Sequence, residues 1–476
     1  MKAVAVTEEN VPLMKSLGKT MLLDARGKDE TWALSSTYSS DFSKDITSFQ
    51  SEDKCLFLSD YSVFANAFHF FDRSINSQLV TDALNRMDDN RVVMGWGPDE
   101  KYTVEKISKN SLQINPADWT ENLPVLSNFE ATLEQHTHAT TVNDDDNVHT
   151  VCFLVSDGDN FDWLLKEFYG QPKAYGSPNR GQVSIGWSIS PALSELGPTL
   201  MKYFYDKATN TATVKDYFVG STSGLGYMNP DLFPNLQASA DLTSKFMKKA
   251  DLNILNIIGT KYNTDDMKKY LGQDNIDAVF YYKYDNYAGL NGAIYTVDNK
   301  LVIGARYRLW DGFDNASTLA NKLNHQSTDA YSSAGYSLIA VHAWSFNQYV
   351  VNEINACASQ LNSNVIVVSP DEFVKRIKKK FGLSTAIKKN LSIDDDILVY
   401  PNPVHINYLN IKGKLKNNDI IEIVDINGRV IIKKKVATES ANNIRIELKS
   451  STSNGFFFVK IVRNDKVLTT KFSVQR

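Results

Sequence analysis

The chain has 476 residues, a formal net charge of −4 at pH 7 and 42% hydrophobic residues. This is the composition of a globular protein with two or three domains. The balanced charge gives no electrostatic argument for nucleic acid or an anionic membrane as a partner. The apolar runs have only the length of strands, so no transmembrane segment is predicted. Three cysteines, Cys55, Cys152 and Cys357, lie far apart in apolar segments and predict buried thiols.

Residues 1–140 contain four apolar runs, KAVAV, TMLLDAR, KCLFLSD and RVVMGWG, that alternate with helical stretches. This pattern predicts an N-terminal α/β domain. No glycine-rich phosphate-binding motif follows any of these runs, so we predict no nucleotide and interpret the domain as a scaffold. The segment GWGPDE can project Trp96, Asp99 or Glu100 toward a neighbouring domain. The acidic stretch 139–148, which His136 and His138 precede, is interpreted as a solvated connector.

Residues 141–382 have a regular pattern of eight short apolar runs, most of which are followed by a helical pattern. Runs of this kind are typical of buried parallel strands. The exception follows the fifth run, where Asp298, Asn299 and Lys300 predict a hairpin turn before the sixth. A (β/α)-barrel accounts best for the whole pattern, and a doubly wound open sheet is the alternative.

The last part of the chain differs in composition. Residues 383–396 are polar and without periodicity, which predicts a linker. Residues 397–476 contain alternating strands and an Asn-Gly turn at 427–428. This pattern predicts a small antiparallel β-sandwich.

A glycine-rich loop, GSTSGLGYMNPDLFP from Gly220 to Pro234, follows the third run of the barrel. Gly224 and Gly226 can take positive φ at no steric cost, so the chain can coil tightly and bring Tyr227 to a defined place. Because the site of a parallel barrel lies at the carboxyl ends of its strands, we expect the functional residues in this loop and after the other strands.

The residues after the strands are mainly acids and aromatics, a combination that favours a carbohydrate ligand. We predict that Asp157 and Asp159 form the catalytic centre with an acid from another strand end, Glu372 first and Asp285 second. The predicted substrate-binding residues are Asn160, Trp187, Gly224, Gly226, Tyr227, Tyr282, Arg306, Arg308, Trp310, His342 and Trp344.

Several alternatives stay open. Glu372 also fits the first turn of a capped helix. No cofactor is predicted, but Asp157, Asp159 and Asn160 could hold a divalent metal, as in a deacetylase-like barrel. The same acids and aromatics could also form the cleft of a glycan-binding protein without catalysis.

The glycine-rich loop also carries a resemblance. Gly224, Gly226, Tyr227 and Pro230 resemble the motif of the GxGYxYP family, whose name describes its members as glycoside hydrolases, although Asn229 replaces the second Tyr. The resemblance extends to about residue 382 and includes GWGPDE at Gly95 and VSDGDN at Val155. It implies a hydrolase that acts on a glycan.

A second resemblance covers the final domain. The segments YPNP at 400–403, VDINGRV at 424–430 and GFFFVKI at 455–461 are similar to the C-terminal sorting domain of the type IX secretion pathway of Bacteroidota. This implies the type IX machinery as a partner and a location outside the cell or on the outer-membrane surface. No signal peptide follows Met1, so we expect the natural start to lie upstream.

Overall fold

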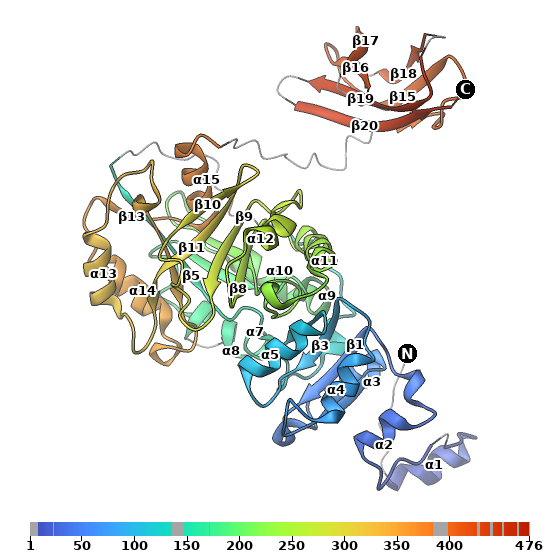
Figure 1. Ribbon diagram of the computed structural model, residues 1–476, viewed down its shortest axis with the longest axis vertical. Coiled ribbons are helices and arrows are strands. Elements are labelled where there is room, and N and C mark those ends of the chain that lie inside the picture. Colours follow the sequence, from blue (N-terminus) through green and yellow to red (C-terminus); the bar gives the residue numbers. More distant parts are fainter. Residues whose placement is uncertain are drawn as a thin grey trace. The chain divides into compact units, whose positions relative to one another are not determined.

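The computed structural model describes residues 8–21, 23–135, 147–170, 172–383, 398–425, 429–437, 441–449, 452–463 and 466–475. His136, His138, nearly all of the acidic connector, the predicted linker from residue 384 on and the turn at 427–428 lie outside these residues. The chain forms two compact units, Met1–Thr385 and Ala386–Arg476. Both units are shown in Figure 1.

The N-terminal part of the first unit is a four-stranded parallel sheet in the order β2-β1-β3-β4. Its strands are β1 (Ile46–Gln50), β2 (Phe68–Phe71), β3 (Arg91–Gly95) and β4 (Leu112–Asn115), and its helices are α1 (Val11–Ser16), α2 (Glu30–Ser35), α3 (Ser59–Ala65), α4 (Gln78–Asn85), α5 (Glu100–Lys109) and α6 (Leu123–Leu126). Helix α5 begins after Asp99, whose side chain accepts the N–H of Tyr102 at 2.9 Å, as a helix N-cap does. The α/β prediction for this part is confirmed.

The rest of the first unit is a closed barrel of seven parallel strands. The ring runs β5-β6-β7-β8-β9-β11-β12 and returns to β5, because β11 pairs with both β9 and β12. The strands are β5 (His149–Val155), β6 (Ile185–Ile189), β7 (Asp216–Gly220), β8 (Ile254–Gly259), β9 (Ala278–Lys283), β11 (Lys300–Leu309) and β12 (Tyr336–Val341). The predicted barrel is confirmed, and the open-sheet alternative is wrong.

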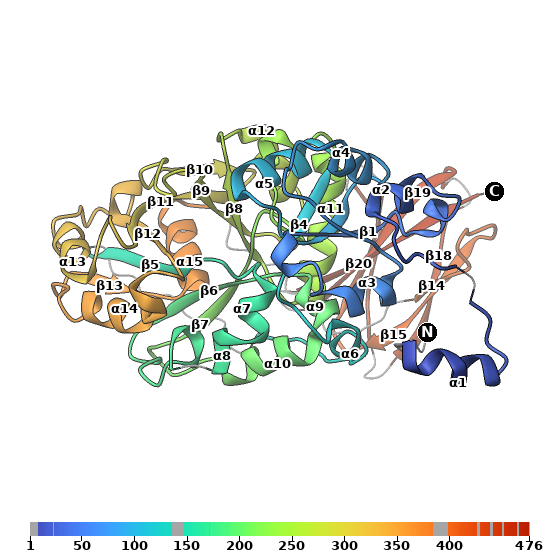
Figure 2. The same cartoon turned by 90° about the horizontal axis from the view of Figure 1, so that it is seen from below.

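Helices surround the ring, as Figure 2 shows. They are α7 (Phe161–Leu165), α8 (Glu167–Gly170), α9 (Leu193–Leu196), α10 (Pro198–Lys207), α11 (Leu236–Lys249), α12 (Thr264–Leu271), α13 (Ala316–Asn324) and α14 (Val350–Ala358). The side chains of β5 alternate between two apolar clusters. Phe153 packs with residues of the surrounding helices, whereas Cys152 and Leu154 pack with residues of the opposite strands inside the ring.

The predicted hairpin is confirmed, but the eighth barrel strand is not. Strand β10 (Ile294–Val297) pairs antiparallel with β11 through a turn in which Asp298 and Asn299 both have positive φ. Strand β13 (Val365–Val367) pairs only with the first residues of β5, while β6 pairs with its last two. It therefore lies outside the ring, and the chain continues into α15 (Pro370–Lys380).

Helix α15 closes the amino-terminal end of the barrel. Its side chains Phe373, Val374 and Ile377 are buried in the cluster that fills the ring. The ring of Phe373 lies 5.9 Å from that of Tyr336, the first residue of β12. Figure 1 shows α15 and the four-stranded sheet at opposite ends of the barrel, so the sheet lies at the end where the strands terminate.

The second unit consists of two antiparallel sheets, in the orders β14-β15-β18 and β17-β16-β19-β20. Its strands are β14 (Leu398–Tyr400), β15 (Tyr408–Leu415), β16 (Ile420–Asp425), β17 (Val430–Lys435), β18 (Ala441–Glu447), β19 (Gly455–Arg463) and β20 (Lys466–Val474). One apolar cluster contains residues of both sheets, for example Ile411 and Ile461. The β-sandwich prediction is confirmed.

In the described part of the chain, none of the helices has the length and apolar character that crossing a membrane requires.

Candidate active site

The loop after β5 is held tightly against the end of β6. The N–H of Gly158 donates to Ser188 Oγ at 2.9 Å, and its carbonyl accepts the N–H of Ser190 at 2.7 Å. A Cβ atom at Gly158 would lie 1.8 Å from the carbonyl oxygen of Ser188, so only glycine fits here. Asp157 has a φ of 67°. This close contact fixes the positions of Asp157 and Asp159 on either side of the glycine.

The two aspartates have different environments. Trp344 Nε1 donates to Asp157 Oδ1 at 2.9 Å, and Ser156 Oγ donates to its Oδ2. Asp159 is 7% exposed, and its Oδ1 accepts a hydrogen bond from Thr222 Oγ1 at 3.3 Å. Burial, followed by the negative charge of Asp157, raises the pKa of Asp159 to about 7. A carboxyl group that keeps its proton near neutral pH therefore lies beside a hydrogen-bonded carboxylate.

The third acid comes from the N-terminal sheet. Glu100 is the first residue of α5, and its Oε1 accepts a hydrogen bond from Tyr227 Oη at 3.4 Å. Part of this side chain is exposed, but its carboxyl end lines the same cavity as both aspartates. Burial, followed by the charge of Asp157, raises the pKa of Glu100. The interpretation of the N-terminal domain as a scaffold is therefore incomplete.

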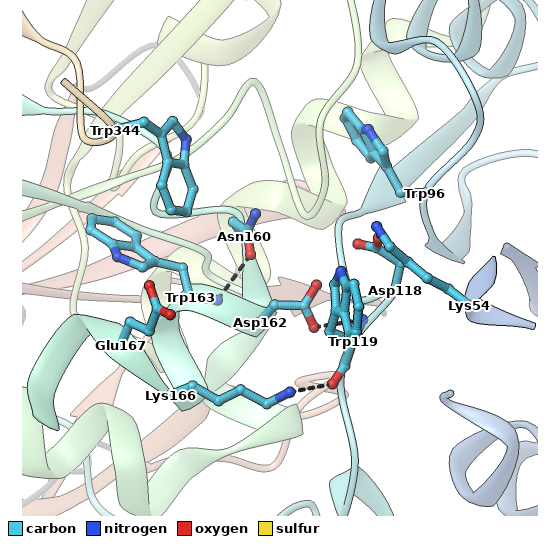
Figure 3. Close-up of a pocket in the computed structure, with 10 residues that line it drawn as sticks. All are labelled: Lys54, Trp96, Asp118, Trp119, Asn160, Asp162, Trp163, Lys166, Glu167 and Trp344. Atoms are coloured by element: carbon cyan, nitrogen blue, oxygen red, sulfur yellow. Dashed lines mark hydrogen bonds and ion pairs between the residues drawn. The ribbon is translucent and has the colours of Figure 1, made fainter. Parts of the chain in front are cut away.

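These acids line a cavity of about 230 Å³ that opens beside a larger one of about 520 Å³. We call them the acid cavity and the tryptophan cavity. The acid cavity is lined by Trp96, Glu100, Pro116, Asp118, Ser156, Asp157, Asp159, Asn160, Thr222, Tyr227, Asn256, Ile258, Tyr287 and Trp344. The tryptophan cavity is lined by Lys54, Trp96, Asp118, Trp119, Asn160, Asp162, Trp163, Lys166, Glu167 and Trp344. Figure 3 shows Trp163 and Trp344 on one side of it and Trp96 and Trp119 on the other.

The structure does not bring Glu372 and Asp285 to the aspartates. Glu372 lies in the first turn of α15 at the opposite end of the barrel, where its Oε1 is 2.8 Å from the guanidinium of Arg376. Its predicted position on a barrel strand is wrong because β13 leaves the ring. Asp285 is exposed and is not one of the residues that line either cavity.

Two predicted aromatic contacts lie beneath the surface. Trp187 is 0% exposed and packs against the surrounding helices, with its Nε1 donating to Asp216 Oδ1 at 3.0 Å. It is too deeply buried to be a sugar platform. Tyr282 is also buried and stacks on Tyr287, with ring centroids 5.1 Å apart. It therefore supports a cavity wall rather than forming one.

The predicted arginines also point elsewhere. Arg306 donates to the carbonyls of Tyr336 and Ser333 at 3.0 and 2.8 Å, near the start of β12. Arg308 lies 3.9 Å from the ring centroid of Phe313. Both guanidinium groups thus have structural partners outside the two cavities.

Trp310 and His342 form a pair at the edge of the site. Their rings stack at 4.0 Å, and His342 Nδ1 lies 2.9 Å from Ser345 Oγ. Burial lowers the pKa of His342, whereas the nearby charge of Asp157 raises it. Neither residue lines the cavities, whereas the predicted residues Asn160, Tyr227 and Trp344 do.

The alternative of a divalent metal at Asp157, Asp159 and Asn160 receives no support from the arrangement of the side chains. Among the residues that the structure describes, no group of three or more His, Cys, Asp or Glu side chains is arranged to hold a metal ion.

Three segments of the chain match known families. Residues 147–378 match the GxGYxYP putative glycoside hydrolase C-terminal domain, and residues 44–128 match the GxGYxYP third domain. A crystal structure described as a putative hydrolase from Bacteroides thetaiotaomicron is 32% identical over 79% of this chain and 75% of its own, with a TM-score of 0.69. The chain belongs to the GxGYxYP family.

Other solved structures are much less similar to this GxGYxYP chain. An engineered protein is 11% identical over 62% of this chain and 77% of its own, with a TM-score of 0.20. A calcium-binding mutant of β-glucuronidase 2 from Bacteroides uniformis is 11% identical over 68% of this chain and 45% of its own, with a TM-score of 0.24. These scores are too low to indicate a shared fold. No curated protein matches the sequence.

The third match concerns export. Residues 398–475 match a secretion system C-terminal sorting domain. A sorting domain of the type IX pathway directs the GxGYxYP chain to the cell surface or the extracellular space, and the secretion machinery handles it on the way.

The glycines of the GxGYxYP motif serve a purpose other than the predicted one. Neither Gly224 nor Gly226 has a positive φ. A Cβ on Gly224 would lie 2.5 Å from Gln113 Oε1, and one on Gly226 would lie 2.8 Å from the carbonyl oxygen of Ile114. Because Ile114 and Tyr227 exchange backbone hydrogen bonds at 3.1 and 2.7 Å, the motif joins the barrel to β4. Close backbone approach requires glycine at position 226, whereas at position 224 the side chain of Gln113, which accepts from the N–H groups of Leu225 and Gly226, leaves little room for a Cβ.

Several cavity residues of the N-terminal sheet lie outside the site predicted from the sequence. The sequence predicts for Glu100 only that it can face a neighbouring domain, and the predicted site contains neither Asp118 nor Trp119. Glu100 follows β3, whereas Asp118 and Trp119 follow β4. The rule that places functional residues after the strands of a parallel sheet holds for this sheet too and identifies all three residues.

Proposed function

We propose that the chain hydrolyses glycosidic bonds in the acid cavity, with Asp159 as the general acid and Asp157 as its carboxylate partner. The observation that carries this proposal is the convergence of Glu100, Asp157 and Asp159 in one cavity at the carboxyl ends of the strands. Glycoside hydrolysis needs one protonated and one ionised carboxyl group beside the scissile bond.

Asp159 suits the acid role. Its buried carboxyl group has a pKa raised to about 7, so it carries a proton at the pH at which a leaving group must be protonated. The pKa also predicts the sign of the pH dependence. Hydrolysis should fall as the pH rises through about 7, because Asp159 then loses the proton that it donates.

Asp157 suits the role of the carboxylate. Both of its oxygens accept hydrogen bonds, from Trp344 and from Ser156, and such donors stabilise negative charge. That charge can stabilise the positive charge that develops on the sugar ring in the transition state. The charge of Glu100 contributes to the raised pKa of Asp159, and Tyr227 holds the Glu100 carboxyl group by a hydrogen bond.

The rest of the cavity also supports a sugar substrate. Trp96, Tyr227 and Trp344 add aromatic surface to a polar wall that includes Asn160 and Asn256. Aromatic faces pack against the C–H face of a sugar ring, while amide and carboxyl groups bond its hydroxyls. The family name and the hydrolase neighbour agree with this assignment.

The test is a glycan panel that includes nitrophenyl and dinitrophenyl glycosides together with natural oligosaccharides. Asp159→Asn should lower kcat on oligosaccharides by at least about two orders of magnitude. The loss on dinitrophenyl glycosides should be much smaller, because that leaving group needs no proton. Asp157→Asn should lower kcat on both kinds of substrate. The matched control, Asp298→Asn, changes an exposed turn residue to one that also tolerates its φ of 50° and should keep full activity.

Equal losses on both kinds of substrate for Asp159→Asn would refute its role as the acid. Full activity of both aspartate variants would place the reaction elsewhere. Binding of a glycan by calorimetry without turnover in any assay would instead indicate a binding protein.

A further inference from the structure

The tryptophan cavity adjoins the acid cavity but takes no part in the chemistry described so far. We propose that it is a second sugar subsite, in which an uncharged pyranose ring stacks on Trp119 while the next unit of the same glycan occupies the acid cavity. This inference rests on the proposed function, because it assigns the substrate as a neutral glycan of at least two units.

Trp119 is exposed but firmly held. Trp119 is 44% exposed and lines the tryptophan cavity. Its indole lies 4.9 Å from the ring of Phe57 and 4.9 Å from Lys54 Nζ. Its backbone N–H donates to Asp162 Oδ1 at 3.0 Å, and its carbonyl accepts from Lys166 Nζ at 2.5 Å. A large apolar side chain that is fixed in an exposed position is suited to bind a ring without ordering cost.

The cavity continues into the acid cavity. The two share Trp96, Asp118, Asn160 and Trp344. Trp344 is 38% exposed, and its indole both lines the tryptophan cavity and donates to Asp157. The volume of about 520 Å³ falls in the range of about 300 to 1,000 Å³ that is usual for ligand sites. A glycan can therefore extend from one cavity into the other without leaving the protein surface.

The polar groups of the cavity favour a neutral sugar. Asp118 lies beside Asp162 and forms an ion pair with Lys54. Burial, followed by the neighbouring Asp118, raises the pKa of Asp162 to about 7, so Asp162 carries its proton below neutral pH. The one remaining charge is balanced by Lys54.

The other charged pair of the lining is also balanced. Lys166 and Glu167 carry opposite charges, and both have hydrogen-bond partners, the carbonyl of Trp119 and Gln348 Nε2. The described lining thus leaves no excess positive charge for a uronate or a sulfate. Its carboxyl and amide groups are instead ready acceptors and donors for sugar hydroxyls.

The experiment compares substrates of increasing length. Neutral cello-, xylo-, manno- and chito-oligosaccharides of one to six units, as nitrophenyl glycosides, are the probes, with oligogalacturonides as charged probes. We expect Trp119→Ala to lower the ratio of kcat/KM for the trimer to that for the monomer by about tenfold, as loss of one stacking contact predicts. Trp119→Phe should restore most of that ratio, because the ring and its packing against Phe57 remain. Tyr102→Ala, which removes an exposed aromatic side chain outside both cavities, should leave the ratio unchanged.

The outcomes separate this inference from the proposed hydrolysis. If Asp159→Asn abolishes turnover of oligosaccharides but Trp119→Ala leaves the length ratio unchanged, the subsite is refuted and the hydrolase stands. If no probe is hydrolysed but Trp119→Ala weakens calorimetric binding of a neutral oligosaccharide, the subsite is supported and the hydrolase is refuted. Preference for oligogalacturonides over every neutral probe would overturn the assignment of an uncharged sugar.

Discussion

Replacing Asp159 by Asn should make the protein more stable while making it inactive. In the folded chain burial raises the pKa of this carboxyl group from 3.8 to about 7. Between these two values the folded state keeps the proton and the unfolded state releases it, so the free energy of unfolding of the wild type falls as the pH rises through this window. Asparagine has the same shape, keeps an acceptor for Thr222, and has no proton to lose.

The expected gain follows from the two pKa values. Each pH unit within the window costs the wild type about 1.4 kcal/mol. The Asn variant should therefore be more stable by about 2 kcal/mol at pH 5 and by about 4 kcal/mol at pH 8, relative to a common baseline below pH 4. The difference grows up to about pH 7, because the folded wild-type protein keeps a proton that the unfolded chain releases, and it levels off above that value.

The assay is denaturant unfolding of the full chain at pH 5 and pH 8, followed by tryptophan fluorescence. Asp298→Asn, which also converts an aspartate to asparagine but in an exposed turn, is the matched control. Its stability difference from the wild type should not change between the two pH values. If the advantage of Asp159→Asn does not grow between pH 5 and pH 8, Asp159 is not buried among other acids and the argument for its acid role fails.

Three further predictions concern two residues that hold the site in place, Gly158 and Tyr227, and one residue that lies far from it, Glu372. Gly158→Ala should destabilise the protein by several kcal/mol and abolish activity, because its Cβ would overlap the carbonyl of Ser188; thermal unfolding measures the first effect. Glu372→Gln should change kcat by less than about twofold, since this residue lies at the far end of the barrel, and a kcat lowered a hundredfold would contradict that placement. Tyr227→Phe removes the hydrogen bond to Glu100 and should lower kcat about tenfold with an unchanged melting temperature.

The fold and one half of the site follow from local sequence patterns. Short apolar runs identify the barrel strands, and the carboxyl-edge rule places Asp157, Asp159 and Tyr227 at one end of them. These inferences succeed because they need only the direction of each strand. The same patterns do not tell which face of a strand a side chain occupies. Trp187, which is predicted at the site, packs beneath the surrounding helices instead.

The remainder depends on contacts between distant segments. Nothing local to NVIVVS shows that β13 leaves the ring, because its pairing with β5 is limited by β6, which occupies the other half of the same edge. The roles of Gly224 and Gly226 are likewise set by a strand more than one hundred residues earlier. Glu100 reaches the aspartates only because that strand docks on the glycine-rich loop.

The backbone bridge between Ile114 and Tyr227 joins the small N-terminal sheet to the barrel, and each of the two parts supplies a different set of cavity residues. The proposed catalytic acids, Asp157 and Asp159, belong to the barrel, whereas Trp96 and Trp119 follow strands of the small sheet. If the chain is the glycoside hydrolase proposed above, changes confined to the small sheet would alter the contacts of Trp96 and Trp119 with the sugar and leave the two aspartates unchanged. Any such change must still keep the last strand of the sheet at backbone distance from Gly226.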